Sequence, residues 1–378
     1  MKRIIASVTA NVILIIFVIF GFGHFYGEAH SDILGKELEE RARQSFKGVI
    51  TLWQVDSFEG GVGSRTAWLN SALSRLEKRY NGVYFVVKSV SVELLPTLLA
   101  QSRPDLISFG HGVFTQDQAL ELFEKIQYNG EPLIPSLLKS TDGYAVPLFF
   151  GGYCLLTANQ YTSFTSYPDD IAQCLSQDFG TVSYNKQKRA VVPLVAGDYN
   201  TSLAALALAL GFGSVKKEAH LCSSDALWDH YNYNELSASA LVSQRQLYRL
   251  SAATDKGKGR KSQVLNIYPY TDMVQYLAVF KGGSDKKQRV MSAVIEHLTS
   301  TAIQMTLSSI GIMPSSLAAL AAIKYENQYM QTLCDGYRDK HICLPHAFAS
   351  LDNVSALAQE HLAGKSDGFN VFAQSLIK

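Results

Sequence analysis

Length, composition and charge already limit what this chain can be. Its 378 residues predict two folded units of about 150 residues each rather than one core. Hydrophobic residues make up 47% of the chain and charged residues 18%, which is typical of a globular protein and excludes extended disorder. The net charge of +1 gives no basic surface for nucleic acid, so no nucleic-acid partner is predicted.

An apolar segment follows two basic residues at the amino terminus. Residues 4–22 come after Lys2 and Arg3, and their polar side chains are Ser7, Thr9 and Asn11. As a helix this segment spans about 28 Å, close to the hydrocarbon thickness of a bilayer. The basic residues predict that the chain starts inside and continues outside. We therefore expect a transmembrane anchor within residues 1–27, with a cleaved signal peptide as the alternative, and a charged helical stalk over residues 28–47.

Five cysteines are an odd number for a chain that is predicted to be exported. Cys334 and Cys343 are predicted to form a disulfide that closes a short loop, and the other cysteines to be small buried apolar residues. Together with His341 and His346 these two cysteines also form a metal-like cluster. Its spacing matches no standard zinc site, so neither a metal nor a cofactor is predicted.

After residue 47, short apolar runs alternate with segments of helical periodicity, which is typical of an α/β fold. The strong periodicities give the element types, and the flanking glycines and prolines give approximate ends. The predicted strands are residues 49–53, 83–90, 105–109, 144–150 and 277–280, and the predicted helices are residues 65–80, 201–210, 285–299, 317–329 and 354–362.

A more specific pattern begins at residue 49. A first strand that ends in Leu52-Trp53 leads into a glycine-rich loop over residues 54–63, and a helix ending in Lys78-Arg79-Tyr80 follows before the second strand. This order resembles the opening of the extracellular solute-binding proteins of ABC importers, of the maltose- and oligosaccharide-binding type. Pro104-Asp105 resembles the start of the family's third strand.

Two later segments carry the same resemblance. Residues 145–159, from Ala145 to Asn159, resemble the family's first crossing between lobes, and residues 291–314 resemble its late helix with a Gly-x-x-Pro exit. Together the similar segments cover most of residues 48–318. The chain departs from the family near the second crossing, where residues 268–272 replace a glycine pair.

The resemblance implies an α/β, two-lobed periplasmic-binding-protein-like fold of type II, in which a hinge joins lobes built from discontinuous segments. The hinge is expected at residues 151–156 and 268–272. Lobe I is expected to contain residues 48–153 and 272–313, and lobe II residues 154–271 and 314–378.

The resemblance also implies a function. A receptor of this kind captures a small polar ligand, here expected to be a carbohydrate, by closure of its cleft and delivers it to the transmembrane subunits of an ABC permease. The domain would lie outside the cell membrane and have no enzyme activity. A membrane-tethered sensing module that presents ligand to a signalling partner is the alternative. A hydrolase is disfavoured, because residues 60–65 lack the lysine of a phosphate-binding loop and no Gly-x-Ser-x-Gly elbow occurs.

The loop after the first strand holds most of the predicted ligand-binding residues. Its glycines allow the backbone to approach a ligand closely. Asp56 is predicted to accept sugar hydroxyls and Trp53 to stack on a ring. The alternative is that Trp53 packs under the sheet and the acids are only solvated. The predicted residues here are Trp53, Gln54, Asp56, Ser57 and Glu59.

Further candidates follow the third strand and the two crossings. Phe109 and His111 lie where open α/β sheets place ligands, although His111 could equally be a surface residue. Three tyrosines at the crossings either line the cleft or pack in the hinge, and two residues before the helix at 201–210 bind ligand or cap that helix. These five are Tyr153, Tyr268, Tyr270, Asp198 and Tyr199.

Overall fold

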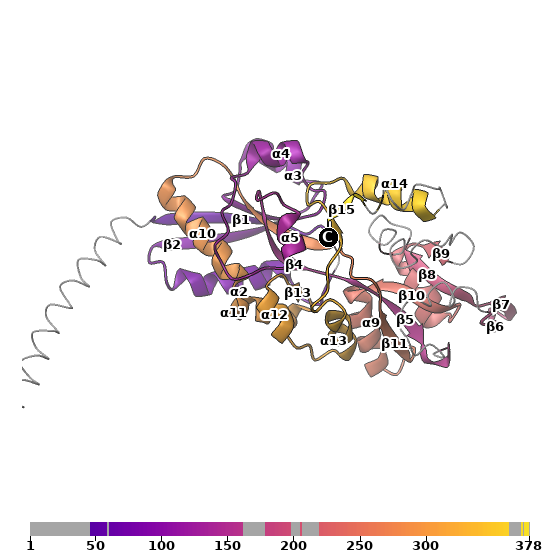
Figure 1. Ribbon diagram of the computed structural model, residues 1–378. Helices are drawn as coiled ribbons and strands as arrows, with labels where there is room; N and C mark the ends of the chain where they lie inside the picture. The colour runs from indigo at the N-terminus through magenta and orange to yellow at the C-terminus, as the bar shows by residue number, and fades with distance from the viewer. Residues whose placement is uncertain are drawn as a thin grey trace, which may run out of the picture.

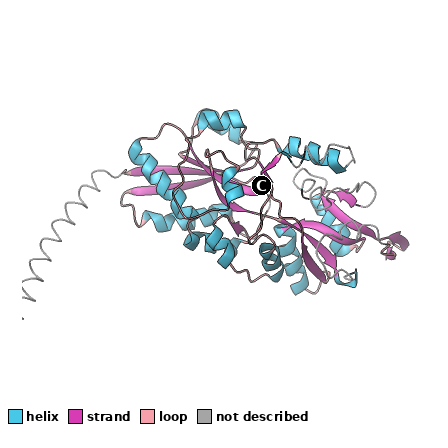
Figure 2. Cartoon of the chain, viewed as in Figure 1, coloured by secondary structure: helices cyan, strands magenta, loops and turns pink. Residues whose placement is uncertain are grey.

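A computed structural model describes residues 46–58, 60–161, 178–197, 205, 219–362, 372 and 374–377. The described strands form two main sheets, one on each side of the molecule, with helices packed around both (Figures 1 and 2). Within these residues no helix is long and apolar enough to cross a bilayer. The predicted anchor at 1–27, most of the stalk at 28–47 and nearly all of the helix at 201–210 lie outside the described residues.

The first sheet has six strands in the order β13-β4-β12-β3-β1-β2. β1 is parallel to β2 and β3, and β12 is antiparallel to β3 and β4. The central strands β3, β4 and β12 are buried along their whole length, as their continuous apolar sequences predict. The strands are β1 (Gly48–Val55), β2 (Val83–Val90), β3 (Leu106–Gly110), β4 (Val146–Phe150), β12 (Val274–Val279) and β13 (Met313–Pro314).

Two long amphipathic helices contact each other beside this sheet. α2 (Arg65–Glu77) begins where the Ser64 hydroxyl accepts a hydrogen bond from the amide of Ala67, and α10 (Asp285–Thr299) begins at Ser284. The indole of Trp68 on α2 donates a 2.8 Å hydrogen bond to Thr306. The remaining elements here are α3 (Leu95–Gln101), α4 (Gln116–Leu122), α5 (Pro135–Lys139), α11 (Thr301–Gln304), the 3-10 helix η4 (Met305–Ile310) and α12 (Leu317–Ala322).

The second sheet has five strands in the order β11-β5-β10-β8-β9. Trp228 is buried there. Its strands are β5 (Tyr153–Ala158), β8 (Val192–Gly197), β9 (Ala219–Cys222), β10 (Ser237–Ser243) and β11 (Ser262–Asn266), with the hairpin β6 (Thr181–Tyr184) and β7 (Gln187–Ala190). Its helices are α8 (Ser224–Trp228), the π-helix η3 (Asp229–Tyr233), α9 (Gln244–Asp255) and α13 (Gln328–Asp335).

The chain passes between the sheets several times. It leaves β4 through Gly151 and Gly152 into β5, and returns from β11 through residues 267–273 into β12. After α12 it crosses again to α13, which packs on β11 and α9. β14 (Leu344–Pro345) then pairs with β15 (Leu376–Ile377), and α14 (Leu351–Leu362) follows. The backbone of Ala347 bonds to Gly112 and Ser140, so this segment, expected in lobe II, also contacts the first sheet's loops.

Two sequence predictions about the C-terminal region are wrong. The helix predicted at 317–329 is two helices, because Asn327 caps a new helix and Arg338 donates to the carbonyls of Leu320 and Ile323 at the end of α12. Cys334 and Cys343 form no disulfide. Each thiol is buried in a different hydrophobic cluster, which explains why the two do not meet.

Candidate functional site

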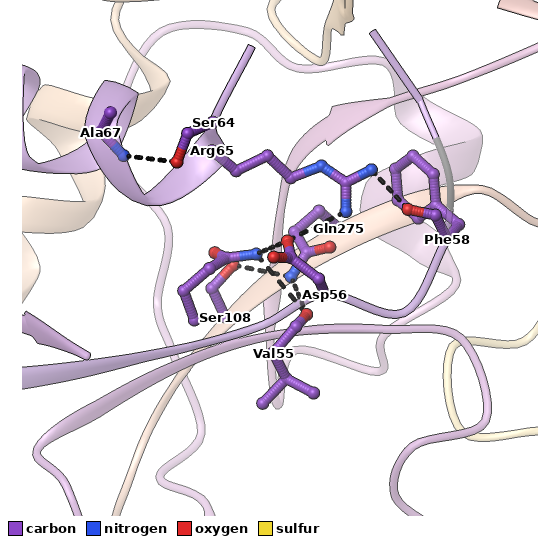
Figure 3. A network of polar contacts seen from close by, with 9 residues as sticks. Val55, Asp56, Phe58, Ser64, Arg65, Ala67, Ser108 and Gln275 are labelled. Atoms are coloured by element: carbon purple, nitrogen blue, oxygen red, sulfur yellow. Dashed lines mark hydrogen bonds and ion pairs between the residues drawn. The ribbon is translucent and has the colours of Figure 1, made fainter. Parts of the chain in front are cut away.

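Two glutamines meet at the edge of the first sheet where β1 and β3 end and β12 begins. Gln54 donates through Nε2 to Asp56 Oδ1 at 3.0 Å. Figure 3 shows that Gln275 donates through Nε2 to the Val55 carbonyl, at 2.9 Å, and to Ser108, at 3.0 Å. A carboxylate and a carbonyl only accept hydrogen bonds, so these contacts fix which end of each amide is nitrogen. Both side chains therefore turn their Oε1 atoms away from these acceptors.

Those two amide oxygens lack hydrogen-bond partners among the described residues. Oε1 of Gln54 and Oε1 of Gln275 are buried and unpaired, and the Ser57 hydroxyl beside them is also unpaired. Ser57 lies against Gly110 of β3, where a Cβ would approach the serine oxygen to 1.7 Å. Buried polar atoms are nearly always hydrogen-bonded, so this group of three unpaired oxygens marks the edge of the sheet as unusual.

An ion pair lies next to the glutamines. Arg65, in the first turn of α2, donates through Nη1 to Asp56 Oδ1 at 3.2 Å and through Nη2 to the Phe58 carbonyl at 2.6 Å (Figure 3). The arginine side chain is 5% exposed and that of Asp56 is 53% exposed. Burial lowers the pKa of Arg65, and the charge of Asp56 opposes this effect. The guanidinium remains charged at neutral pH because its ordinary pKa is above 12.

The loop that carries Asp56 contacts η4 closely at a glycine. Gly61 has a φ of +71°, and a Cβ on it would lie 1.8 Å from the carbonyl oxygen of Ile310. The next amide, that of Val62, donates a 3.0 Å hydrogen bond to that same oxygen. Only glycine fits both the backbone conformation and the close approach. The aromatic ring of Phe58 lies on the guanidinium of Arg65, 4.0 Å from its carbon to the ring centre.

One residue from the second sheet's side reaches this loop. Gln244, the first residue of α9, is fully buried and accepts a 3.0 Å hydrogen bond from the amide of Gly152 in the first linker. Its Nε2 atom has no partner among the described residues, and it lies close to the backbone of Gly60 and Gly151. The loop, the linker and the second lobe therefore converge at this amide.

The structure brings three of the predicted site residues together: Gln54, Asp56 and Ser57. It adds Arg65, Gln275, Ser108 and Gln244, which sequence reasoning missed. Arg65 had one readable signal, its position directly after the helix cap Ser64 at the end of the glycine-rich loop. The other three could not be found this way, because their positions relative to the loop depend on the tertiary fold.

Trp53 and Phe109 lie in the core rather than beside these residues. Trp53 is 6% exposed and alternates with Gln54 along β1, so the two side chains project from opposite faces of the sheet. The ammonium of Lys88 on β2 lies 5.4 Å from the indole centre. Phe109 is fully buried and stacks on Phe123. This geometry favours the packing alternative for Trp53 over ligand stacking, and it places Phe109 in the core, where no ligand role was expected to put it.

His111 is also interior, and its ring nitrogens are occupied. Nδ1 lies 2.8 Å from the Asp272 carbonyl, and Nε2 lies 2.9 Å from the Tyr276 hydroxyl and 3.0 Å from the Pro345 carbonyl. Burial lowers the pKa of His111 to about 4, against the opposing effect of the two carbonyls. A neutral ring that donates from Nδ1 and accepts from Tyr276 satisfies both nitrogens. These contacts give His111 a structural role.

Two of the three tyrosines at the crossings contact a buried carboxylate. Tyr153 and Tyr270 are buried, and their hydroxyls donate to Asp272. Tyr268 is 45% exposed and accepts a long hydrogen bond from the thiol of Cys343. Packing in the hinge, one of the two alternatives from the sequence, thus describes Tyr153 and Tyr270.

Three predicted residues, Glu59, Asp198 and Tyr199, lie outside the described residues. In the part of the chain that the structure describes, no three His, Cys, Asp or Glu side chains are placed to hold a metal ion.

Comparison with known proteins identifies the fold. No family model matches the sequence, and no curated protein matches it. Solved structures do match. A cyclic α-maltosyl-1,6-maltose binding protein from Arthrobacter globiformis has a TM-score of 0.60 and 13% identity, with 87% of this chain and 97% of that chain covered.

Two other structures show the same likeness with different ligands. The GacH receptor of Streptomyces glaucescens, solved with acarbose, has a TM-score of 0.55 and 12% identity over 88% of this chain and 97% of its own. A GABA receptor has a TM-score of 0.53 and 14% identity over 86% of this chain and 98% of its own. At these identities the likeness shows the fold alone: this chain has the mixed α/β fold of the periplasmic binding proteins, as predicted.

Proposed function

We propose that this chain is an extracytoplasmic solute-binding receptor that captures a small polar ligand, a carbohydrate, between its two lobes. The observation that carries the proposal is the group of unpaired oxygens at the edge of the first sheet, on Gln54, Ser57 and Gln275. A buried polar atom without a partner costs about 1–3 kcal/mol, and a ligand that supplies the missing hydrogen bonds recovers this free energy. Both amide oxygens accept, so they fit hydroxyl donors.

The ion pair extends the same recognition surface. Asp56 Oδ1 is held by Arg65 and Gln54, and the half-exposed carboxylate retains acceptor capacity for ligand hydroxyls. The positive charge of Arg65 offsets the negative charge of Asp56, so the pair suits a neutral ligand better than an ion. Gln244 would supply a donor from the second lobe. Ligand would therefore be held by acceptors from lobe I and by a donor from lobe II.

Closure of the two lobes is part of the proposal. The glutamine oxygens are buried in the structure described, so ligand entry requires that the lobes separate about the linkers at 151–152 and 267–273. The lobe boundaries expected from the sequence and the type II classification belong to this proposal. So do the membrane anchor at residues 1–27, a location outside the cell membrane and delivery of ligand to an ABC permease.

A binding role suits these side chains better than catalysis. The Ser57 hydroxyl forms no hydrogen bond with a general base among the described residues. The similar solved structures support this reading, because all three are binding proteins or receptors.

A thermal-shift screen of the full chain, followed by calorimetry, tests the proposal. The panel should contain maltotriose, acarbose, GABA and spermidine, since a ligand that binds only the native state raises the melting temperature. We expect an oligosaccharide to stabilise the wild type, and Gln275→Leu to abolish that effect while the fold is kept. A stabilising oligosaccharide that binds Gln275→Leu and Asp56→Ala as tightly as wild type would place the site elsewhere. A response to GABA or spermidine alone would overturn the carbohydrate assignment.

A further inference from the structure

The second linker carries a carboxylate that the proposed ligand site does not use. Asp272 is 3% exposed and lies two residues before β12. The Tyr153 hydroxyl donates to its Oδ1 at 2.9 Å, and the Tyr270 hydroxyl donates to its Oδ2 at 3.0 Å. Tyr153 begins β5 of the second sheet, so the first of these bonds joins that sheet to the linker that enters the first sheet.

Other hydrogen bonds tie the linkers together at this point. The amide of Gly151 in the first linker donates to the carbonyl of Met273 at 2.7 Å. Tyr337, after α13, donates through its hydroxyl to the Tyr270 carbonyl at 2.7 Å and accepts from the amide of Tyr153 at 2.9 Å. Rotation of one lobe against the other must therefore disturb the surroundings of Asp272.

The surroundings of Asp272 offer hydrogen bonds but no positive charge. The titratable groups that face it or its two tyrosines are His111 after β3, Tyr276 on β12, Tyr337 after α13 and Cys343 before β14, with His346 next to His111. Within the described residues no ion pair reaches Asp272. An ionised carboxylate in such a place has lost its hydration without gaining a cation, whereas a protonated one carries no charge.

We propose that Asp272 is a proton-operated latch of the hinge, in which proton uptake holds the lobes closed and proton loss favours their separation. This inference rests on the proposed function, because it concerns the regulation of ligand capture by that hinge. Separation of the lobes would break the Tyr153 contact and admit water to the carboxylate. The ionised form gains most from that water, so ionisation and opening favour each other.

The relevant pH range is near neutrality. Burial raises the pKa of Asp272 to about 7, against the opposing effect of hydrogen bonds from Tyr153 and Tyr270. His111, the neighbouring base, has its pKa lowered to about 4 by burial and stays neutral over this range. Because the closed form has the higher pKa, it binds the proton more tightly than the open form. Closure is therefore favoured below about pH 7 and weakened as the pH rises through that value.

Hydrogen–deuterium exchange on the full chain without ligand tests the latch. Exchange of residues 151–153 and 267–273 is followed from pH 5.5 to 8.5 and corrected for the intrinsic pH dependence of amide exchange. We expect corrected exchange in both linkers to rise severalfold through about pH 7. Asp272→Asn, which cannot ionise, should remove that rise, and Asp255→Asn, an exposed change at the end of α9, should retain it.

A second variant keeps the test decisive if Asp272→Asn does not fold. Tyr153→Phe removes a hydrogen bond that favours the ionised carboxylate, so the transition should move to higher pH. The inference is wrong if corrected exchange in the wild-type linkers does not depend on pH. It is also wrong if Asp272→Asn keeps the wild-type pH dependence, or if Tyr153→Phe leaves the midpoint pH of the transition unchanged. No ligand is needed, so a failed ligand screen with a working pH transition would reject the proposed function and leave the latch intact.

Discussion

Two regions of this molecule are each built around one aspartate, and their surroundings differ in almost every respect. Asp56 is half exposed, is paired with a buried arginine and lies beside amide oxygens that lack partners. Asp272 is buried, both its oxygens are hydrogen-bonded by tyrosines, and no cation of the described residues contacts it. The first region has acceptor atoms available for a ligand. In the second region each carboxylate oxygen already accepts a hydrogen bond, and the remaining change open to the carboxylate is to bind a proton.

The difference shows how burial and pairing, rather than residue type, decide what a carboxylate can do. An exposed carboxylate that is paired with a fixed cation still has acceptor capacity for a ligand. A buried acid that has only neutral donors is sensitive to pH instead.

The largest effect is expected at the loop glycine. Gly61→Ala puts a Cβ 1.8 Å from a backbone carbonyl oxygen and forces a side chain into a positive φ, so it should lower the free energy of unfolding by about 2–4 kcal/mol. The matched control is Gly257→Ala, at a φ of +68° with open space around it, which should cost only about 1 kcal/mol. Denaturant unfolding measures both. If the two substitutions lower the free energy of unfolding equally, the loop does not pack against the Ile310 backbone as described.

Asp272→Ala should come next, because it leaves the hydroxyls of Tyr153 and Tyr270 without an acceptor. At pH 5.5 the variant's free energy of unfolding should be about 2–4 kcal/mol below that of the wild type. This difference should become smaller toward pH 8.5. A raised native pKa means that wild-type stability falls as pH rises between 3.8 and about 7, by at most about 1.4 kcal/mol per pH unit. Chemical unfolding at both pH values checks this. A loss that grows with pH would have the wrong sign for a buried acid.

Asp56→Ala should weaken ligand binding by about ten- to a hundredfold, since hydrogen bonds to charged groups contribute about 1.5–3 kcal/mol. The free energy of unfolding should fall by about 1–3 kcal/mol, because the substitution leaves the buried guanidinium of Arg65 without its counterion. Calorimetry with the oligosaccharide found by thermal screening measures the affinity. Asp225→Ala serves as the control, since it removes an exposed ion pair with Arg249 away from the site. Equal affinities for the two variants would exclude Asp56 from the site.

The smallest effect concerns the cysteines. Cys334 and Cys343 form no disulfide, so a reducing agent should leave the melting temperature unchanged and both thiols should be alkylated once the chain is unfolded without reductant. Removing a real disulfide typically costs about 2–5 kcal/mol. If a reducing agent clearly lowers the melting temperature of the wild type but not that of Cys334→Ser, the disulfide does form.

Much of the fold could be predicted because local patterns determine it. The strand at residues 83–90 and the helix at 285–299 have the predicted ends. The apolar residues of the strand and the serine cap of the helix, Ser284, can both be read from the sequence. The prediction of a single helix at 317–329 was wrong because of a contact with a residue outside that segment. Arg338 takes up the carbonyls at its break, and nothing in the sequence of the helix itself shows that contact.

The proposed site could be predicted only where residues adjacent in the sequence contribute to it. Gln54, Asp56 and Ser57, which the structure places together, all follow the end of a predicted strand. Gln275 was missed because it meets Val55 across 220 residues. Position near a strand end also could not separate Asp56, at the surface, from His111, in the interior, because depth is set by the segments that fold over each strand end.

Hydrogen–deuterium exchange of the full chain, with and without the oligosaccharide found by screening, can show whether the ligand is captured between the lobes. If the ligand is captured between closing lobes, residues 54–65 and the linkers at 151–153 and 267–273 should become protected together. That joint protection should be lost in Asp56→Ala at the same ligand concentration. Binding confirmed by calorimetry with no protection in either the loop or the linkers would contradict the account.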